Sequence, residues 1–230
     1  MAQDGHDRTG RAQTETEPAR APLSKERVLS AAIKLANRDG IDSLTMRNLA
    51  HELGAGAMSL YHHVANKDEL LDAMVDLVVG EIAAALPSDL ADWKTAMRQR
   101  ASAAHEVLVR HRWATMLIVS RINLGPGMSR YLDSTLRTLR EAGFSIELAL
   151  DAWHAMDSHI YGFTLQELNL PFAADAIPEM AASFVPQISA EHYPYAYEAA
   201  THAMAAGRQE TIEFGIDLIL DGLDRLRDTP

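Results

Sequence analysis

Residues 40–71 read GIDSLTMRNLAHELGAGAMSLYHHVANKDELL, and this stretch decides the fold. Residues 43–45 are a helix start signal, and the apolar residues after them repeat along one helical face: Met46, Leu49, Ala50 and Leu53. The glycines at 54 and 56 then predict a turn, followed by a short helix from about Ala57 to His63. A helix, a glycine-bearing turn and a short helix are typical of a helix-turn-helix, whose second helix enters the major groove of DNA.

A longer helix is expected on each side of this unit. Ser24 is a plausible N-cap for a helix that ends at Gly40. Asn66 is expected to cap another helix that runs to about Ala85, with Glu69 completing a capping box. Residues 23–70 therefore form the predicted DNA-binding domain. Residues 1–22 are polar and show no hydrophobic periodicity, so we expect a disordered tail there.

Beyond residue 71 the sequence predicts one helix after another, with breaks that include Gly125–Gly127, Gly143 and the segment from Asn169 to Pro186. No alternating strand pattern occurs, so the predicted fold is all-α, with residues 71–230 as a larger helical domain. Two of its helices, at about 145–168 and 211–226, are apolar over a wide arc. Burial on more than one side is expected, as in a two-fold four-helix interface between the protomers of a homodimer.

Composition excludes several classes of protein. The chain has no cysteine and no run of about 20 apolar residues, so disulfides, thiolate metal sites and a membrane span are not expected, and the cytoplasm is the expected location. Its net charge of −11 seems to oppose DNA binding. Residues 1–70, however, hold nine basic and ten acidic side chains, whereas residues 71–230 hold 12 and 22. The acidity lies almost entirely outside the predicted DNA-binding domain.

An enzyme is not expected. The sequence contains no phosphate-binding glycine loop, no GxSxG elbow and no HExxH motif, and no cofactor is predicted. The adjacent His62 and His63 cannot both face one partner on a helix, so no metal site is expected there.

Residues 40–71 also resemble the tetracycline-repressor (TetR) family. The residues that carry the resemblance are Leu44-Thr45, Arg47, Leu49-Ala50, Leu53-Gly54, Leu60-Tyr61, His63-Val64, Asn66-Lys67 and Leu70-Leu71. The segments FSIELALDAWHAMDSHIYGFTLQEL (144–168) and FGIDLILDGLDRL (214–226) are similar, more weakly, to the dimerisation helices of its tetracycline-repressor branch. The resemblance implies a ligand-responsive repressor whose homodimer binds a near-palindromic double-stranded operator. It also implies that a bound ligand shifts the helix from Asn66 to about Ala85 and with it the DNA-binding domain.

Chemistry and resemblance together give the candidate DNA contacts. The guanidinium group of Arg47 can bind a phosphate or a guanine edge with two hydrogen bonds, and Ala57 and Met58 can contact thymine methyl groups. The resemblance implies DNA contacts for Thr45, Arg47, Ser59, Tyr61, His63 and Lys67. His62 completes the candidate set, but it stands where the tetracycline repressor has a tryptophan, so the operator sequence does not carry over.

Ligand sensing is inferred mainly from the resemblance, and the expected small-molecule effector is largely apolar. Candidate wall and polar residues of its pocket are Met97, Arg100, Trp113, Met116, Arg121, Trp153, His154 and Tyr161. Ile118 falls where the tetracycline repressor has its metal-binding histidine, and Ala83 and Ala104 do not match its drug-contacting residues. Tetracycline with magnesium is therefore not the expected effector. The alternative function is a helical, dimeric interaction protein or sensor that does not bind a specific DNA sequence.

Overall fold

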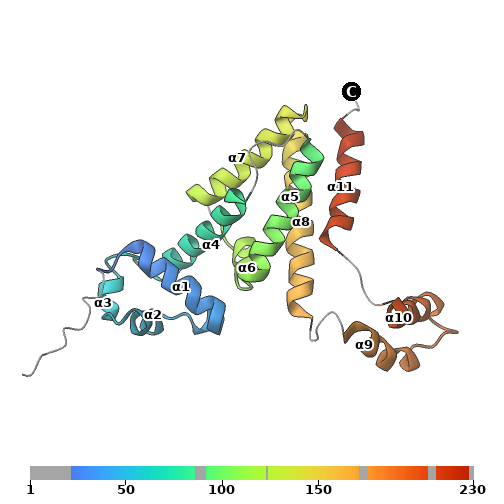
Figure 1. The fold of residues 1–230 in the computed structure, drawn as a ribbon, viewed down its shortest axis with the longest axis horizontal. Coiled ribbons are helices and arrows are strands. Elements are labelled where there is room, and N and C mark those ends of the chain that lie inside the picture. The colour runs from blue at the N-terminus through green and yellow to red at the C-terminus, as the bar shows by residue number, and fades with distance from the viewer. Residues whose placement is uncertain (1–21, 86–91, 123, 171–175, 207–210, 228–230) are drawn as a thin grey trace, which may run out of the picture.

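The computed structural model describes residues 22–85, 92–122, 124–170, 176–206 and 211–227, and within these ranges all regular structure is helical (Figure 1). Except for Pro22, the predicted tail lies outside the described residues. The elements are α1 (Lys25–Asp39), η1 (Ile41–Ser43), α2 (Met46–Leu53), α3 (Ala57–Leu60), α4 (Lys67–Ala84), α5 (Trp93–Arg110), α6 (Ala114–Ser120), α7 (Pro126–Glu141), α8 (Ile146–Asn169), α9 (Ile177–Phe184), η3 (Val185–Gln187), α10 (Pro194–Ala206) and α11 (Ile212–Arg227).

Local capping sets the bounds of the first helices. Ser24 Oγ accepts a hydrogen bond from the Arg27 backbone N–H at 3.3 Å, and α1 ends at Gly40, whose φ is +81°. The expected first helix is thereby confirmed. The expected third helix is too long, because α3 ends at Leu60 and residues 61–63 form a turn. In that turn the backbone N–H groups of His63 and Val64 both donate to the Leu60 carbonyl, at 2.8 and 3.0 Å.

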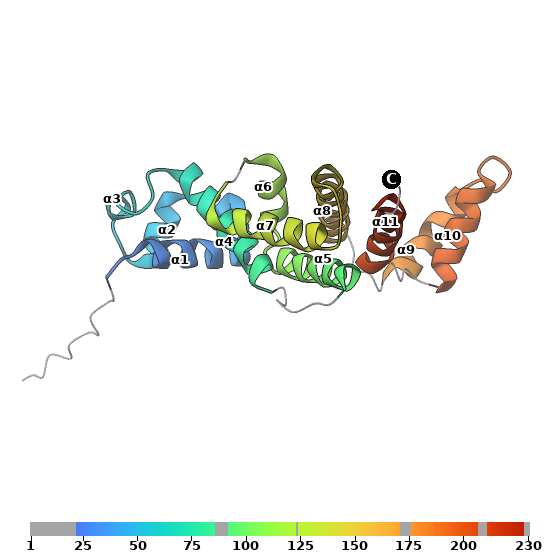
Figure 2. The ribbon, with the colours of Figure 1, turned by 90° about the horizontal axis from the view of Figure 1, so that it is seen from above.

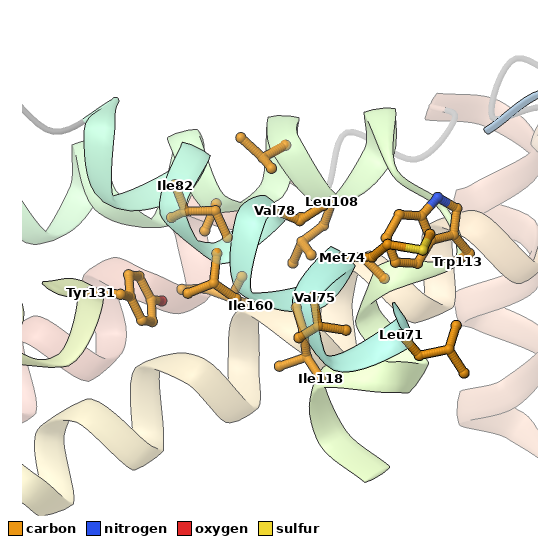
Figure 3. Packing of buried hydrophobic residues seen from close by; sticks show 14 of the residues in the cluster. Leu71, Met74, Val75, Val78, Ile82, Leu108, Trp113, Ile118, Tyr131 and Ile160 are labelled. Carbon is orange, nitrogen blue, oxygen red and sulfur yellow. The ribbon is translucent and has the colours of Figure 1, made fainter. Parts of the chain in front are cut away.

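Helix α4 joins the predicted DNA-binding domain to the rest of the molecule and is apolar along most of its length. Its buried residues are Leu70, Leu71, Met74, Val75, Val78, Val79 and Ile82. They pack against side chains that other helices contribute, among them Leu108, Ile118, Tyr131 and Ile160 (Figure 3). One continuous apolar core therefore runs from the N-terminal helices into the C-terminal body.

A carboxylate fixes α7 on α4. The side chain of Asp76 accepts hydrogen bonds from the backbone N–H groups of Gly127 and Met128, both at 3.0 Å, at the start of α7. Gly127 lies so close to the Asp76 backbone carbonyl that a β-carbon would collide with it. The glycine at this break is thus required by a close approach of two helices.

Helices α5, α7, α8 and α11 form the C-terminal body around the end of α4 (Figures 1 and 2). Helices α9 and α10 pack on each other and lie beyond α8 and α11, at the end of the molecule away from α3. The prediction of a break from Asn169 to Pro186 is wrong in part, because α9 lies inside it. Pro178 lies in the first turn of α9, where a proline is compatible with the start of a helix.

The two long helices of the body keep apolar side chains exposed. They are Ile146 and Leu150 on α8 and Phe214, Leu218 and Leu226 on α11. Gly162 in α8 and Gly222 in α11 have open space where a β-carbon would stand, so no neighbour within the protomer explains them. Among the helices that the structure describes, none is long and apolar enough to cross a membrane.

Candidate DNA-reading surface and effector site

Hydrogen bonds between nearby residues set the start of helix α2, and a glycine sets its end. Thr45 Oγ1 accepts from the Asn48 backbone N–H at 3.1 Å, and the Asn48 side-chain amide donates to the Ser43 carbonyl at 2.8 Å. Gly54 then ends α2 in the left-handed conformation, with φ +60° and ψ +36°, and α3 starts after Gly56. The buried side chains of Leu49 and Leu60 hold α2 and α3 on the core, so the opposite faces of both helices are free to contact another molecule.

The nine predicted DNA-contact residues lie on α2, on α3 and the turn after it, and at the start of α4. Eight of them are exposed: Thr45, Arg47, Ala57, Met58, Ser59, Tyr61, His62 and Lys67. Met58 is 76% exposed although it is apolar, so its side chain is available for contact with another molecule. His63 is half-buried. In the described part of the chain, no group of three metal-ligating side chains occurs.

The start of α4 presents Lys67 beside free backbone N–H groups. Asn66 Oδ1 accepts from the Glu69 N–H at 2.8 Å, which confirms the predicted cap. Glu69 Oε2, however, accepts from the Ala65 N–H at 2.7 Å and not from Asn66, so the capping box is displaced by one residue. This hydrogen bond and the ion pair with Lys25 hold the pKa of Glu69 below its usual value. A helix N-terminus with an adjacent lysine is a favourable place for a DNA phosphate.

A buried polar cluster lies inside the C-terminal body, between α5, α7 and α8. Arg100 is fully buried, and its guanidinium group pairs with Asp157, donates to the Tyr131 hydroxyl, and donates through Nε to Thr135 Oγ1 at 2.9 Å. Asp157 also accepts from the hydroxyl groups of Tyr131, at 2.9 Å, and Tyr161, at 3.1 Å. Arg100 Nη1 has no hydrogen-bond partner among the described residues.

The charges in this cluster compensate one another. Burial lowers the pKa of the Arg100 guanidinium group, but Tyr131 and Asp157 more than offset burial, and the pKa is raised. Burial raises the pKa of the Tyr131 hydroxyl well above its usual value, and it raises that of Tyr161 as well. A charged arginine paired with one carboxylate and two neutral tyrosines is therefore the stable state of the cluster.

The other predicted effector residues do not gather at one point. Met97 is buried one turn before Arg100, whereas Met116 is 57% exposed and His154 is exposed and stacked on Trp153, with ring centroids 4.6 Å apart. The indole N–H of Trp153 is buried and has no partner among the described residues.

Two further candidate effector residues, Arg121 and Trp113, contact residues outside the buried polar cluster. Arg121 pairs with Asp72 at 2.6 Å and with Asp68 at 3.1 Å, both on α4. Trp113 is buried at the junction with α1, where its indole N–H donates to Asn37.

Sequence reasoning missed Tyr131, Thr135 and Asp157 as members of the buried cluster. A signal was present for Asp157, since a carboxylate on the apolar side of a long helix needs a buried partner. The partner, Arg100, lies 57 residues earlier in the chain, and no local pattern connects the two.

Comparison with known proteins identifies the family to which this chain belongs. Residues 28–74 match the profile described as "Bacterial regulatory proteins, tetR family", and residues 86–227 match "Tetracyclin repressor-like, C-terminal domain". The chain belongs to the TetR family. This TetR-family protein is accordingly a ligand-responsive, DNA-binding transcriptional repressor and not an enzyme, as the sequence indicated.

Individual relatives extend the match over most of the chain. The protein is 31% identical over 229 residues to the HTH-type transcriptional repressor DrrR1 of Streptomyces coeruleorubidus, covering 91% of this chain and 81% of that one. It is 34% identical over 152 residues to the class D tetracycline repressor protein of Escherichia coli, covering 64% of this chain and 67% of that one. The crystal structure of Streptomyces coelicolor ActR in complex with actinorhodin superposes with a TM-score of 0.77 at 26% identity, covering 91% of this chain and all of ActR.

Proposed function

We propose that this TetR-family repressor reads its operator with α3 in the major groove, while α2 and the start of α4 contact the phosphate backbone on either side. The exposed Met58 carries this proposal, because it lies on the short second helix of the motif with no covering side chain. Arg47 and Lys67 supply cations at the two flanks, and Thr45, Ala57, Ser59, Tyr61, His62 and His63 complete the contact set. Since the repressor acts on DNA, we place it in the cytoplasm of a bacterial cell.

The protein is proposed to act as a homodimer joined through α8 and α11. On α11, Phe214, Leu218, Gly222 and Leu226 follow one another at intervals of four residues and so line one face. Phe214, Leu218 and Leu226 are 68%, 60% and 57% exposed, and the space beside Gly222 is open. A second copy of the same two helices would cover these faces, and a two-fold dimer reads a near-palindromic operator.

The effector is proposed to bind in the C-terminal body against the buried polar cluster. Arg100 Nη1 and the Trp153 indole N–H are buried donors without partners, and Met97 and Tyr161 add apolar surface close to Arg100 and Asp157. An unsatisfied buried donor costs free energy, so a ligand oxygen that accepts from it gains affinity. These contacts favour a largely apolar effector that carries at least one acceptor oxygen. ActR, whose structures hold (S)-DNPA and actinorhodin, supports a small organic molecule.

Operator binding is tested with duplexes selected from a random library by the full-length protein. We expect the selected duplexes to be near-palindromic, and we expect Arg47→Ala to weaken their binding by about tenfold or more, as loss of a bidentate contact does. Tyr61→Phe should weaken binding less, because only a hydroxyl is removed. Arg137→Ala, which removes an exposed arginine on α7, is the matched control. Failure to select any near-palindrome would favour a helical interaction protein without specific DNA binding.

Effector binding is tested with actinorhodin as the probe. Binding should release the operator, and Arg100→Lys, which cannot offer a planar fork of donors, should weaken probe binding more than operator binding. The same operator affinity with the probe demonstrably bound would contradict release by this effector.

A further inference from the structure

Four side chains from three elements meet where the DNA-binding domain joins the C-terminal body. Asn37 comes from the last turn of α1, Glu81 from α4, and His111 and Trp113 from the turn between α5 and α6. His111 Nδ1 lies 3.1 Å from Asn37 Oδ1, and His111 Nε2 lies 3.2 Å from Glu81 Oε2. Trp113 Nε1 lies 2.7 Å from the same Asn37 oxygen. We call these four residues the junction cluster.

The chemistry of the donors fixes which atoms carry protons. An indole N–H can only donate, so the Asn37 atom that faces Trp113 is the carbonyl oxygen. That oxygen therefore also accepts from His111, and Nδ1 must carry a hydrogen. Glu81 Oε2 is a carboxylate oxygen and can only accept, so Nε2 must carry one too. Both hydrogen bonds exist together only when the His111 ring is an imidazolium.

The charged surroundings of the ring agree with this state. Helix α4 contributes Glu81, and Arg110, on the same helix end as His111, shares the Glu81 oxygen at 3.2 Å. Helix α1 contributes the neutral Asn37, and Trp113 places its ring centroid 6.0 Å from that of His111. His111 itself is only 4% exposed. The Glu81 carboxylate thus faces the imidazole, and the neighbouring cation, Arg110, pairs with that carboxylate.

We propose that the junction cluster positions the DNA-binding domain on the C-terminal body and is complete only while His111 is protonated. Asn37 lies on α1, against which α2 packs, whereas His111 and Trp113 belong to the body. A DNA-binding domain held in place loses less freedom when the operator binds, so the closed cluster raises operator affinity. Deprotonation of His111 removes one of the two hydrogen bonds and loosens the domain. Operator affinity therefore depends on whether His111 carries its charge.

The first test uses Asn37, because its side chain is exposed and its truncation opens no cavity. With the operator duplex selected by the unmodified protein, Asn37→Ala should weaken binding by about tenfold, within the usual range of coupling between sites. Arg112→Ala is the matched control, since Arg112 lies in the same turn but donates to the Leu168 carbonyl on α8. The control should change binding less than about twofold. Equal binding by Asn37→Ala and the control, or tighter binding by Asn37→Ala, would overturn the proposal.

The second test isolates the charge of His111. The ratio of operator affinities between the unmodified protein and His111→Gln should be about ten where His111 is charged, and it should fall towards one as the pH rises and the ring loses its proton. His51, His62 and His63, at the DNA-reading end, are present in both proteins, so their contribution cancels in the ratio. A merely structural role of His111 would give a ratio that does not change with pH, and this result would overturn the dependence on protonation.

Two further variants keep the test decisive if His111→Gln does not fold. Glu81→Gln changes an exposed side chain, and the glutamine amide can donate to an unprotonated Nε2 as well as accept from a protonated one, so operator binding by this variant should depend less on pH than binding by the unmodified protein. Asn37→Asp keeps an acceptor for both Trp113 and His111 and adds a charge, so it should bind the operator at least as tightly as the unmodified protein below neutral pH. Helix content and oligomeric state, measured for each variant, separate loss of the cluster from loss of the fold.

Discussion

Arg100 and Asp157 form a buried ion pair at the centre of the C-terminal body, where the guanidinium group is fully enclosed and the carboxylate is 8% exposed. Two tyrosine hydroxyl groups complete the coordination of the carboxylate. Removing one member of such a pair leaves the other charge buried and uncompensated. The pair is therefore a point at which a small chemical change has a large effect on stability.

Asp157→Asn tests this directly. The substitution keeps the shape of the side chain but removes its charge, and we expect it to lower the free energy of unfolding by about 3 kcal/mol. Urea denaturation followed by circular dichroism measures the change. Asp133→Asn is the control, because Asp133 forms an exposed pair with Arg137, and its effect should stay within about 0.5 kcal/mol. Similar losses of unfolding free energy in both variants would show that the buried ion pair contributes no more to stability than an exposed one.

Alkaline pH should unfold the protein through the same cluster. Burial raises the pKa of the Tyr131 and Tyr161 hydroxyl groups, so both stay neutral in the folded chain when the unfolded chain ionises, near pH 10. The folded state is stabilised below that pH and loses the stabilisation as the pH rises further. Tyr131 and Tyr161 should therefore ionise only together with loss of helix.

Tyrosinate absorbance and circular dichroism, recorded in one titration, check this coupling. Tyr131→Phe should reduce the rise in tyrosinate absorbance that accompanies loss of helix, whereas Tyr193→Phe, which changes an exposed ring, should leave that rise unchanged. Ionisation of every tyrosine without loss of helix would contradict the burial argument.

The sequence was sufficient where the determinants are local. Ser24, Thr45 and Asn66 cap helices because the backbone groups that they bind are three residues away, and Gly40 and Gly54 end helices through their own backbone angles. The residues proposed to contact DNA occupy the continuous stretch 45–67, in which apolar spacing predicts the outward face.

The buried polar cluster, against which we propose that the effector binds, was less predictable because its contacts are long-range. Arg100 meets Thr135 and Asp157 at separations of 35 and 57 residues, and Trp113 meets Asn37 at a separation of 76. Helical periodicity indicates which face of a helix is buried but not which other helix covers that face. The sequence therefore could not show that Trp113 contacts α1 while Arg100 contacts α7 and α8. Arg121, predicted as a pocket residue, forms ion pairs with Asp68 and Asp72.

Dimer formation should depend on the exposed face of α11. Leu218→Glu places a charge on that face, and we expect the dimer dissociation constant to rise by about 100-fold or more, as it does when a central apolar contact is lost. Analytical ultracentrifugation over a range of concentrations measures it. Val119→Glu is the control, because Val119 is 51% exposed on α6, outside the two proposed dimer helices. Dissociation of both variants, or of neither, would contradict an interface through α8 and α11.

Arg121 should support operator binding without touching DNA. It joins the end of α6 to the first two turns of α4, where it neutralises Asp68 and Asp72 next to Lys67. Arg121→Ala removes the cation that pairs with both carboxylates near the proposed phosphate contact, so we expect operator affinity to fall by about five- to tenfold at low salt, as one lost charge contact does.

Salt separates this electrostatic effect from a loss of structure. Since salt screens exposed charges beyond a few ångströms, the difference between Arg121→Ala and the unmodified protein should shrink as the ionic strength rises. The double variant Asp68→Asn with Arg121→Ala removes one unpaired carboxylate and should recover part of the affinity. A loss that is equal at low and high salt, and that Asp68→Asn does not relieve, would mean that Arg121 acts by fixing α6 on α4 and not through the charge beside Lys67.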